Sequence, residues 1–179
     1  SASEVMKANR RYNQLIAGAQ TSRLDELKSS VQAVIESDRT DRNWGLVTFA
    51  GCSGVRDKGV FSKTERSTLV ELVQGLSTRP ATPLAQALES ALRQSSASQG
   101  NAAVVLVTDG RDTCNGDPCA IAAASGQQVP VHVVTVGHAT QHACISESTG
   151  GDLFTSEHGA DLRQVLTRAI RTATQEDCQ

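Results

Sequence analysis

The sequence predicts a doubly wound α/β fold, with a mainly parallel β-sheet, helices on both of its faces and a short antiparallel edge strand. Three observations predict it. Helical and strand-like segments alternate along the 179 residues. The segment "AAVVLV" (102–107) is apolar at consecutive positions, as expected when helices cover both faces of a parallel sheet. It leads into "TDG" at Asp109, and ligands in this architecture gather at the carboxyl ends of the strands.

The first expected element is an amphipathic helix over residues 22–37. Ser22 is placed to cap its amino end, and Asp25 to complete a capping box with Ser22. The apolar side chains recur at helical spacing. They are Leu24, Leu27, Val31, Val34 and Ile35. Residues 1–21, which precede this helix, form an amino-terminal segment whose structure the pattern does not define.

A hairpin and two further helices are expected next. The segment "GLVTFA" (45–50) has the composition of a buried strand, and "VRDKGVF" (55–61) is expected to fold back on it as a short edge strand. The segment "TPLAQALESALRQ" predicts a helix with Thr82 as its N-cap and Pro83 at its first position. Another helix, between the hairpin and Thr82, is marked by Leu69, Leu72, Val73 and Leu76.

The second half of the chain repeats the alternation of strand and helix. After the strand at 102–107 we expect a short helix at 118–125, a strand "VHVVTV" at 131–136, a small helix ending at Gly150, and a strand "DLFTS" at 152–156. A last amphipathic helix follows. Its apolar positions are Leu162, Val165, Leu166, Ala169 and Ile170.

Composition narrows the class of protein. A chain of 179 residues without internal repeats or linkers is expected to form one domain, 1–179. The formal net charge is −2 with both signs interspersed, so no basic stripe indicates nucleic acid and no polybasic tail indicates a membrane surface. The apolar run at 102–107 is too short to cross a bilayer, so membrane insertion is not expected.

The cysteines indicate a compartment. There are five, several of them in polar loops, and this usage favours an oxidising, extracytoplasmic location such as the periplasm, the cell surface or the exterior. The alternative is five unrelated thiols in a cytosolic protein, because no C-x-x-C pair or regular framework is present.

Several familiar chemistries are excluded by missing motifs. The sequence has no G-x-x-x-x-G-K-[ST] loop for nucleotide phosphates, no G-x-G-x-x-G after a strand and no G-x-S-x-G elbow for a serine nucleophile. Two oxygen-bearing residues on neighbouring elements remain, Thr82 and Asp109. Taken singly, Thr82 is explained as a helix N-cap and Asp109 as a turn residue before Gly110.

The order of the segments resembles that of a von Willebrand factor type A domain, from about Arg23 to the last helix. The matching segments are "GLVTFA", "TPLAQAL", "VVLVTDGRDTC", "VHVVTVG" and "STGGDLF". The "DTCNGDPC" loop is similar to that of secreted or periplasmic bacterial members. The family's metal-ion-dependent adhesion site uses D-x-S-x-S after the first strand, a Thr on a second loop and an Asp after the fourth strand. The resemblance therefore implies metal ligation by Thr82 and Asp109, with Ser1 and Ser3 as the S-x-S.

One part of the family pattern is missing, namely the first strand and the Asp of D-x-S-x-S. Two interpretations stay open: the strand and its Asp lie upstream of Ser1, or "NQLIAG" (13–18) is a degenerate first strand and the site lacks its first carboxylate. In the family's sheet order the first strand lies between the second and the fourth. Its absence would leave the strands at 45–50 and 102–107 with unpaired backbone edges in the middle of the sheet.

The resemblance implies a non-catalytic, protein-binding or adhesion module that uses Mg²⁺, or Mn²⁺ or Ca²⁺, and a partner that supplies an acidic side chain. Magnesium takes oxygen ligands and retains several waters, so we expect weak affinity where the first carboxylate is lacking. One alternative is a scaffold domain that has lost the metal. A more distant one is a metal-dependent phosphoesterase using Asp109, Asp112 and Asp117, although no base or nucleophile is arranged beside them.

The family's strand order also sorts the cysteines. It places Cys52, Cys114, Cys119 and Cys144 at the end of the sheet where the parallel strands terminate, here called the rim. Three pairings are possible. The distances to be spanned are shortest for Cys52 with Cys114 and Cys119 with Cys144. A local Cys114 to Cys119 bond would leave the other two cysteines without a nearby partner. Cys178 is expected at the opposite pole, with a partner upstream of residue 1 or on another chain.

Two histidines near Cys144 raise the question of a zinc site. His138 and His142 have H-x-x-x-H spacing, which suits zinc only on a continuous helix, and Gly137 indicates a loop there. We therefore expect both to be surface histidines.

Overall fold

A computed structural model describes residues 22–98, 102–137, 140–157 and 161–175. The helices are α2 (Arg23–Ser37), α3 (Arg66–Gln74), α4 (Leu84–Ser96), α5 (Pro118–Ser125), α6 (Ala143–Thr149) and α7 (Leu162–Gln175). The strands are β1 (Trp44–Thr48), β2 (Arg56–Phe61), β3 (Val104–Thr108), β4 (Val131–Val136) and β5 (Leu153–Ser156). Short 3₁₀ turns lie at Lys63–Glu65, Gly126–Gln128 and Thr140–His142. The predicted alternation of strand and helix is confirmed.

The strands form two sheets. Parallel strands β3, β4 and β5 lie in that order, with Val104 opposite Val131. Strands β1 and β2 pair as an antiparallel hairpin, with Trp44 opposite Phe61, which confirms the expected edge strand. Within the described ranges no strand joins β1 to β3. The sheet is thus divided where the family's strand order places its first strand, and the segment at 13–18 lies outside the described residues.

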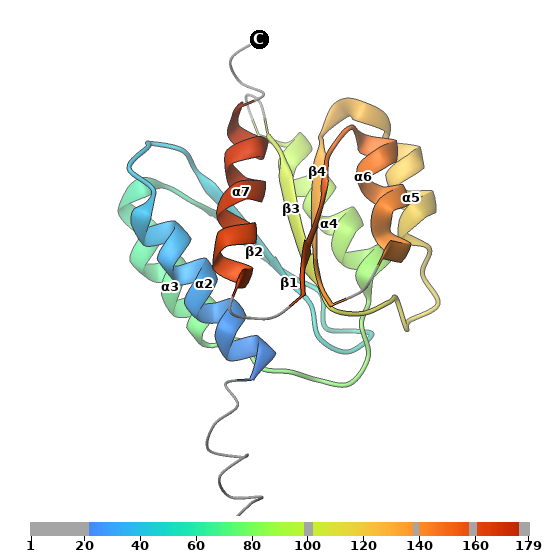
Figure 1. Cartoon of the computed structure of the whole chain (residues 1–179), viewed down its shortest axis with the longest axis horizontal. Helices are drawn as coiled ribbons and strands as arrows, with labels where there is room; N and C mark the ends of the chain where they lie inside the picture. The colour runs from blue at the N-terminus through green and yellow to red at the C-terminus, as the bar shows by residue number, and fades with distance from the viewer. Residues whose placement is uncertain (1–21, 99–101, 138–139, 158–160, 176–179) are drawn as a thin grey trace, which may run out of the picture.

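Helices cover both faces of the sheet, as the fold class requires (Figure 1). Side chains of β3 alternate between the two faces. Val104 and Leu106 pack in a core with α4, α5 and α6, whereas Val105 and Val107 pack in a second core with α2 and α7. Helix α3 contributes Leu69 to a third, smaller core with α2 and β2. None of the helices described here is long and apolar enough to span a membrane.

Helix α2 connects the two ends of the molecule. Its N-cap is Ser22, whose Oγ accepts the Asp25 N–H at 3.1 Å and donates to the Asp25 carboxylate at 2.6 Å, which confirms the predicted helix start. Arg23, its first residue, contacts Asp109 at the end of β3. The helix ends at Ser37 and is followed by Asp38 and the start of β1. Asp109 lies at the rim defined above, and we call the opposite end, with Asp38, the base.

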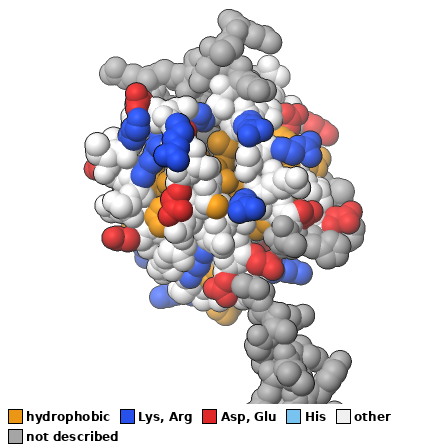
Figure 2. Space-filling view, turned by 60° about the vertical axis from the view of Figure 1, so that its left-hand side comes forward, with side chains coloured by type: hydrophobic (Ala, Val, Ile, Leu, Met, Phe, Trp, Pro, Cys, Tyr) orange, Lys and Arg blue, Asp and Glu red, His pale blue; other side chains and the backbone are white. Residues whose placement is uncertain are grey.

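The surface seen in Figure 2 carries both positively and negatively charged side chains. Lys and Arg lie alongside Asp and Glu there, with small apolar patches between them (Figure 2). This agrees with the interspersed charges of the sequence.

Candidate functional site

The rim brings the loops of Thr82 and Asp109 together. Asp109 follows β3 directly, and Thr82 lies two residues before α4. The Thr82 N–H donates to Thr113 Oγ1 at 2.7 Å, and the Thr113 N–H donates to the Thr82 carbonyl at 3.0 Å. These two hydrogen bonds fix the Thr82 loop against the loop that follows Asp109. Ser1 and Ser3 lie outside the described residues.

Asp112 clamps the same two loops. Its carboxylate accepts the N–H groups of Ala85 at 2.9 Å, Cys114 at 2.8 Å and Gly116 at 2.9 Å. Burial raises the pKa of Asp112, but these backbone donors outweigh it and hold the pKa below its ordinary value. A side chain at 116 would bring its Cβ within 2.5 Å of the Ala85 Cβ, so glycine is required for this close approach.

The prediction that Thr82 caps α4 is wrong. The helix begins at Leu84 with Pro83 as its N-cap, and no side chain of the cap residue bonds to it. An N-cap side chain would accept a hydrogen bond from the Ala85 N–H. Here that N–H donates to Asp112, which lies on another loop. The Thr82 side chain is therefore not used for capping.

The three aspartates of the phosphoesterase hypothesis have different environments. Asp112 is bonded to backbone N–H groups of both loops. Asp117 caps α5 and accepts the Ala120 N–H at 3.0 Å. Asp109 remains exposed, with its side chain 58% accessible. The two later carboxylates thus bind the backbone. The Asp117 cap has a local sequence signal, because an Asp before Pro118 is typical of a helix start, whereas the Asp112 bond to Ala85 joins distant residues.

Two disulfides hold the rim. Cys52 is joined to Cys114, with Cα atoms 5.3 Å apart, and Cys119 to Cys144, with Cα atoms 5.5 Å apart. Of the three pairings left open by the sequence, this is the one with the shortest spans. The first bond ties the β1–β2 turn to the loop after β3, and the second ties α5 to α6. Cys178 lies outside the described residues.

His142 is not the surface histidine that the sequence predicted. It is 3% exposed, and its Nε2 lies 3.0 Å from the carbonyl oxygen of Gly110. Burial lowers the pKa of His142, and the Gly110 carbonyl only partly opposes this. The ring contacts the backbone of Gly110, the residue that follows Asp109. His138 lies outside the described residues.

Asp109 lines an open pocket at the rim. Its polar lining comes from Arg23, Asp109, Arg111 and Gln141. Arg23 Nη1 lies 3.4 Å from Asp109 Oδ2, and the two side chains are 69% and 58% exposed. Solvent and salt screen such an exposed pair, so it contributes little to stability.

Fold and rim geometry together agree with the sequence resemblance. A family model described as "von Willebrand factor type A domain" matches residues 2–111. The chain belongs to the von Willebrand factor type A family. No match was found among curated proteins.

Solved structures share the von Willebrand factor type A fold with this chain at low identity. A von Willebrand factor type A protein from Catenulispora acidiphila superposes with a TM-score of 0.72 at 16% identity, over 84% of this chain and 38% of that one. The conserved hypothetical protein BatB from Bacteroides thetaiotaomicron gives 0.68 at 15% identity, over 87% and 90%. Proximal thread matrix protein 1 from the mussel byssus, with a zinc-occupied MIDAS motif, gives 0.62 at 18% identity, over 83% and 42%.

The side chains of Asp109 and Thr82 at the rim are of the chemical type that binds Mg²⁺ or Ca²⁺. A carboxylate at Asp109 and a hydroxyl at Thr82 are the oxygen ligands that Mg²⁺ and Ca²⁺ take. Among the described residues, however, no group of three or more His, Cys, Asp or Glu is placed to hold a metal ion. A cation held by Asp109 and Thr82 would therefore need waters or further oxygen ligands to complete its coordination.

Proposed function

We propose that this chain is a non-catalytic protein-binding module. In this proposal Asp109 and Thr82 hold a divalent cation at the rim, and an acidic side chain of a protein partner completes the coordination. One observation carries the proposal: Asp109 presents an exposed carboxylate directly after β3, in the loop that is hydrogen-bonded to Thr82 through Thr113, whereas Asp112 and Asp117 are bonded to backbone N–H groups. Membership of the von Willebrand factor type A family supports it.

The expected cation is Mg²⁺, with Mn²⁺ and Ca²⁺ as substitutes. Bound at the rim, it would supply a positive centre that exchanges a water for a partner's carboxylate. The protein's own contribution is to hold the ligands in place. The Thr82 and Thr113 hydrogen bonds and the Asp112 clamp position the two loops, and Ser1 and Ser3 are proposed as additional hydroxyl ligands.

We also propose an extracytoplasmic location, in the periplasm, at the cell surface or outside the cell. Four cysteines are paired in two disulfides, and such bonds persist in oxidising compartments. Cys178 is proposed to pair outside the described residues, with an upstream segment or another chain.

A scaffold domain without metal is the second candidate. Two observations favour it: Arg23 already pairs with Asp109, and the described residues contain no cluster of three or more metal-binding side chains. The two candidates differ in one measurable property, which is affinity for a divalent cation.

Calorimetric titration of Mn²⁺ and Mg²⁺ into the chain tests the proposal. Asp109→Asn and Thr82→Ala are expected to weaken binding, and Asp109→Asn by about tenfold or more, since even outer-shell partners of metals change affinity by about 10- to 100-fold. Asp41→Asn is the matched charge control, because Asp41 is 88% exposed and pairs with Lys63 at the base. Binding that persists unchanged in Asp109→Asn would place the metal elsewhere, and no binding to any variant would support the scaffold.

A further inference from the structure

The loop between Cys114 and Asp117 contains the dipeptide Asn115–Gly116. Asn115 is the only asparagine in the sequence that is followed by glycine. In such a pair the next backbone nitrogen attacks the asparagine side chain most easily, because glycine places no side chain in the way. We propose that Asn115 is a deamidation site that the rim contacts hold unreactive and that reacts when the rim opens. This inference does not depend on the proposed cation.

The reaction needs water and no other reactant. The backbone nitrogen of Gly116 loses its proton and attacks the side-chain carbonyl carbon of Asn115, and the side-chain nitrogen leaves as ammonia. The product is a cyclic imide. Water then adds to one of the two imide carbonyls and the ring C–N bond breaks, which gives aspartate or isoaspartate at position 115. Both products replace a neutral amide by a carboxylate.

The geometry of the loop accounts for both residues of the pair. Asn115 has a φ of 61°, in the left-handed region that asparagine tolerates better than most residues, and it is exposed to water. At Gly116 an added Cβ would lie 2.5 Å from the Cβ of Ala85. The backbone of the rim thus favours, at these two positions, the residue types that react most readily.

Contacts on both sides of Asn115 oppose the reaction. The nitrogen that must attack, that of Gly116, donates to Asp112 Oδ1 at 2.9 Å, and the Cys114 N–H donates to the same oxygen at 2.8 Å. Cys114 is also joined to Cys52. Closing the imide ring rotates the backbone of Asn115 and breaks the Gly116 bond to Asp112. The lowered pKa of Asp112 makes its carboxylate a weak base, so it holds the N–H rather than removing the proton.

Reaction at Asn115 would in turn weaken the rim. An isoaspartate lengthens the backbone between Cys114 and Gly116 by one carbon, so their N–H groups no longer meet the same Asp112 oxygen. The new carboxylate also repels that of Asp112. Because Asp112 accepts the Ala85 N–H as well, the loop before α4 loses part of its attachment.

Peptide mapping by mass spectrometry measures deamidation of Asn115 in the folded chain at neutral pH. The peptide Ac-Asp-Thr-Ser-Asn-Gly-Asp-Pro-Ser-NH₂ gives the rate without the rim contacts. We expect the unmodified chain to react about tenfold more slowly than this peptide, because a hydrogen bond to a carboxylate must break before the attack. Asp112→Ala and Cys52→Ser/Cys114→Ser are each expected to recover most of that difference.

Cys119→Ser/Cys144→Ser is the matched control for the loss of a disulfide. That bond joins α5 to α6, and its removal leaves the Asp112 hydrogen bonds in place, so Asn115 should stay as slow as in the unmodified chain. Asn43 is a control within each chain, since it is exposed but is followed by the bulky Trp44. Circular dichroism establishes that each variant is folded before incubation.

Three outcomes would overturn the proposal. Deamidation of the unmodified chain as fast as that of the peptide would show that the rim does not protect Asn115. A slower reaction in Asp112→Ala than in the unmodified chain would show that the carboxylate acts as a base. Equal rates in the two disulfide variants would show that the contacts of Cys114 do not control the site.

Discussion

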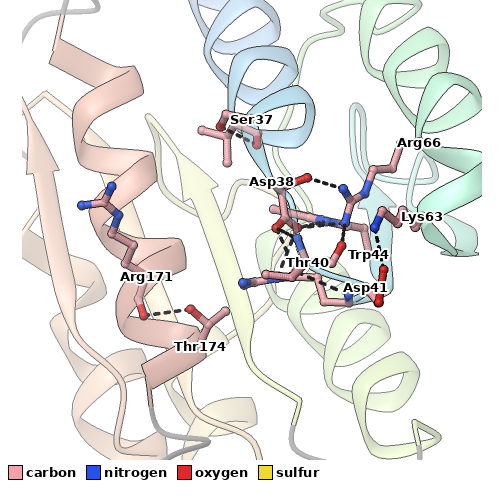
Figure 3. Close-up of polar contacts among 11 residues, drawn as sticks. Ser37, Asp38, Thr40, Asp41, Trp44, Lys63, Arg66, Arg171 and Thr174 are labelled. Carbon is pink, nitrogen blue, oxygen red and sulfur yellow. Dashed lines mark hydrogen bonds and ion pairs between the residues drawn. The ribbon is translucent and has the colours of Figure 1, made fainter.

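The rim and the base of this domain are held together by different chemistry. At the rim one disulfide joins the β1–β2 turn to the loop after β3 and another joins α5 to α6, and the Asp112 carboxylate accepts backbone N–H groups from the Thr82 loop and its own loop. At the base a different carboxylate, Asp38, gathers side chains from three segments (Figure 3). The base therefore depends on ionised and hydrogen-bonded groups, whereas the rim adds covalent links that are insensitive to pH.

Asp38 is the centre of the base. Its side chain is 8% exposed, and its Oδ2 lies 3.1 Å from the Trp44 Nε1, 3.1 Å from the Arg66 Nη2 and 3.2 Å from the Arg42 Nε. Arg66, whose side chain is 13% exposed, also donates to the carbonyl of Asp38 and, at 2.7 Å, to that of Thr40. The end of α2, the start of β1 and the start of α3 are joined in this way.

The difference agrees with the function proposed for the rim. A site there needs an exposed carboxylate at a fixed place, and the disulfides and the Asp112 hydrogen bonds hold the rim loops while Asp109 stays exposed. The base contains the connection between α2 and β1, which a buried ion pair with hydrogen-bonded partners holds in place.

The largest effect is expected at the rim from the double variant Cys52→Ser/Cys114→Ser. The bond spans a sequence separation of 62, and the chain-entropy model assigns about 4 kcal/mol of unfolding free energy to a loop of this size. Urea unfolding followed by circular dichroism measures the loss. Cys119→Ser/Cys144→Ser opens a shorter span of 25 and is expected to lose about 3.5 kcal/mol. Losses below about 1 kcal/mol in both would show that the rim holds without covalent links.

The next largest effect is expected at the base from Asp38→Ala. The change leaves Arg66 buried without its carboxylate, and breaking a buried pair from one side costs about 3 kcal/mol. The same urea experiment measures it. Asp41→Asn is the control from the same segment, because the Asp41 and Lys63 pair is exposed and screened by solvent and so contributes little to stability. Equal effects of the two variants would contradict the central role of Asp38.

A pH series compares the two ends through their carboxylates. Burial raises the pKa of Asp38, but hydrogen bonds from Thr40 and Trp44 and the charge of Arg42 outweigh it, so its pKa is lowered, as is that of Asp112. A group with a lowered folded pKa stabilises the fold above its unfolded value of about 3.9, and the stabilisation is lost as the pH falls through the folded value.

We therefore expect the free energy of unfolding to decrease as the pH is lowered below about 4. Asp38→Asn and Asp112→Asn should each make this decrease shallower, because each variant removes one group that takes up a proton on unfolding. Urea midpoints measured between neutral and strongly acidic pH give the slopes. If both variants lose unfolding free energy with falling pH as steeply as the unmodified chain, neither carboxylate causes the acid destabilisation.

Local patterns predicted most of the fold. The strands and helices were predictable because periodicity and capping signals act within a few residues, as at Ser22 and Asp25. The disulfide pairing followed from strand order, although the sequence alone left three pairings open. Within the described residues the sheet is divided between β1 and β3, where the sequence analysis left the position of the first strand open.

Two side-chain contacts at the rim were not predictable because they join distant positions. Asp112 replaces the expected Thr82 cap by accepting the N–H of Ala85, 27 residues away. His142 is buried by a contact with Gly110 across 32 residues. Neither contact has a sequence signal beyond the presence of a polar side chain. Whether Thr82 and Asp109 bind a cation remains a prediction.

The smallest expected effect is the energetic coupling between the two ends. Asp38→Ala combined with Cys52→Ser/Cys114→Ser should give the sum of the separate losses within about 0.5 kcal/mol, because the sites share no partner. Asp112→Ala combined with the same cysteine pair should depart from additivity by about 1 kcal/mol, since the N–H of Cys114 donates to Asp112. Urea unfolding of the single and combined variants gives both coupling energies. A large coupling energy between base and rim would mean that the two ends unfold as one unit through α2. The two ends would then differ in the chemistry of their contacts but not in their unfolding energetics.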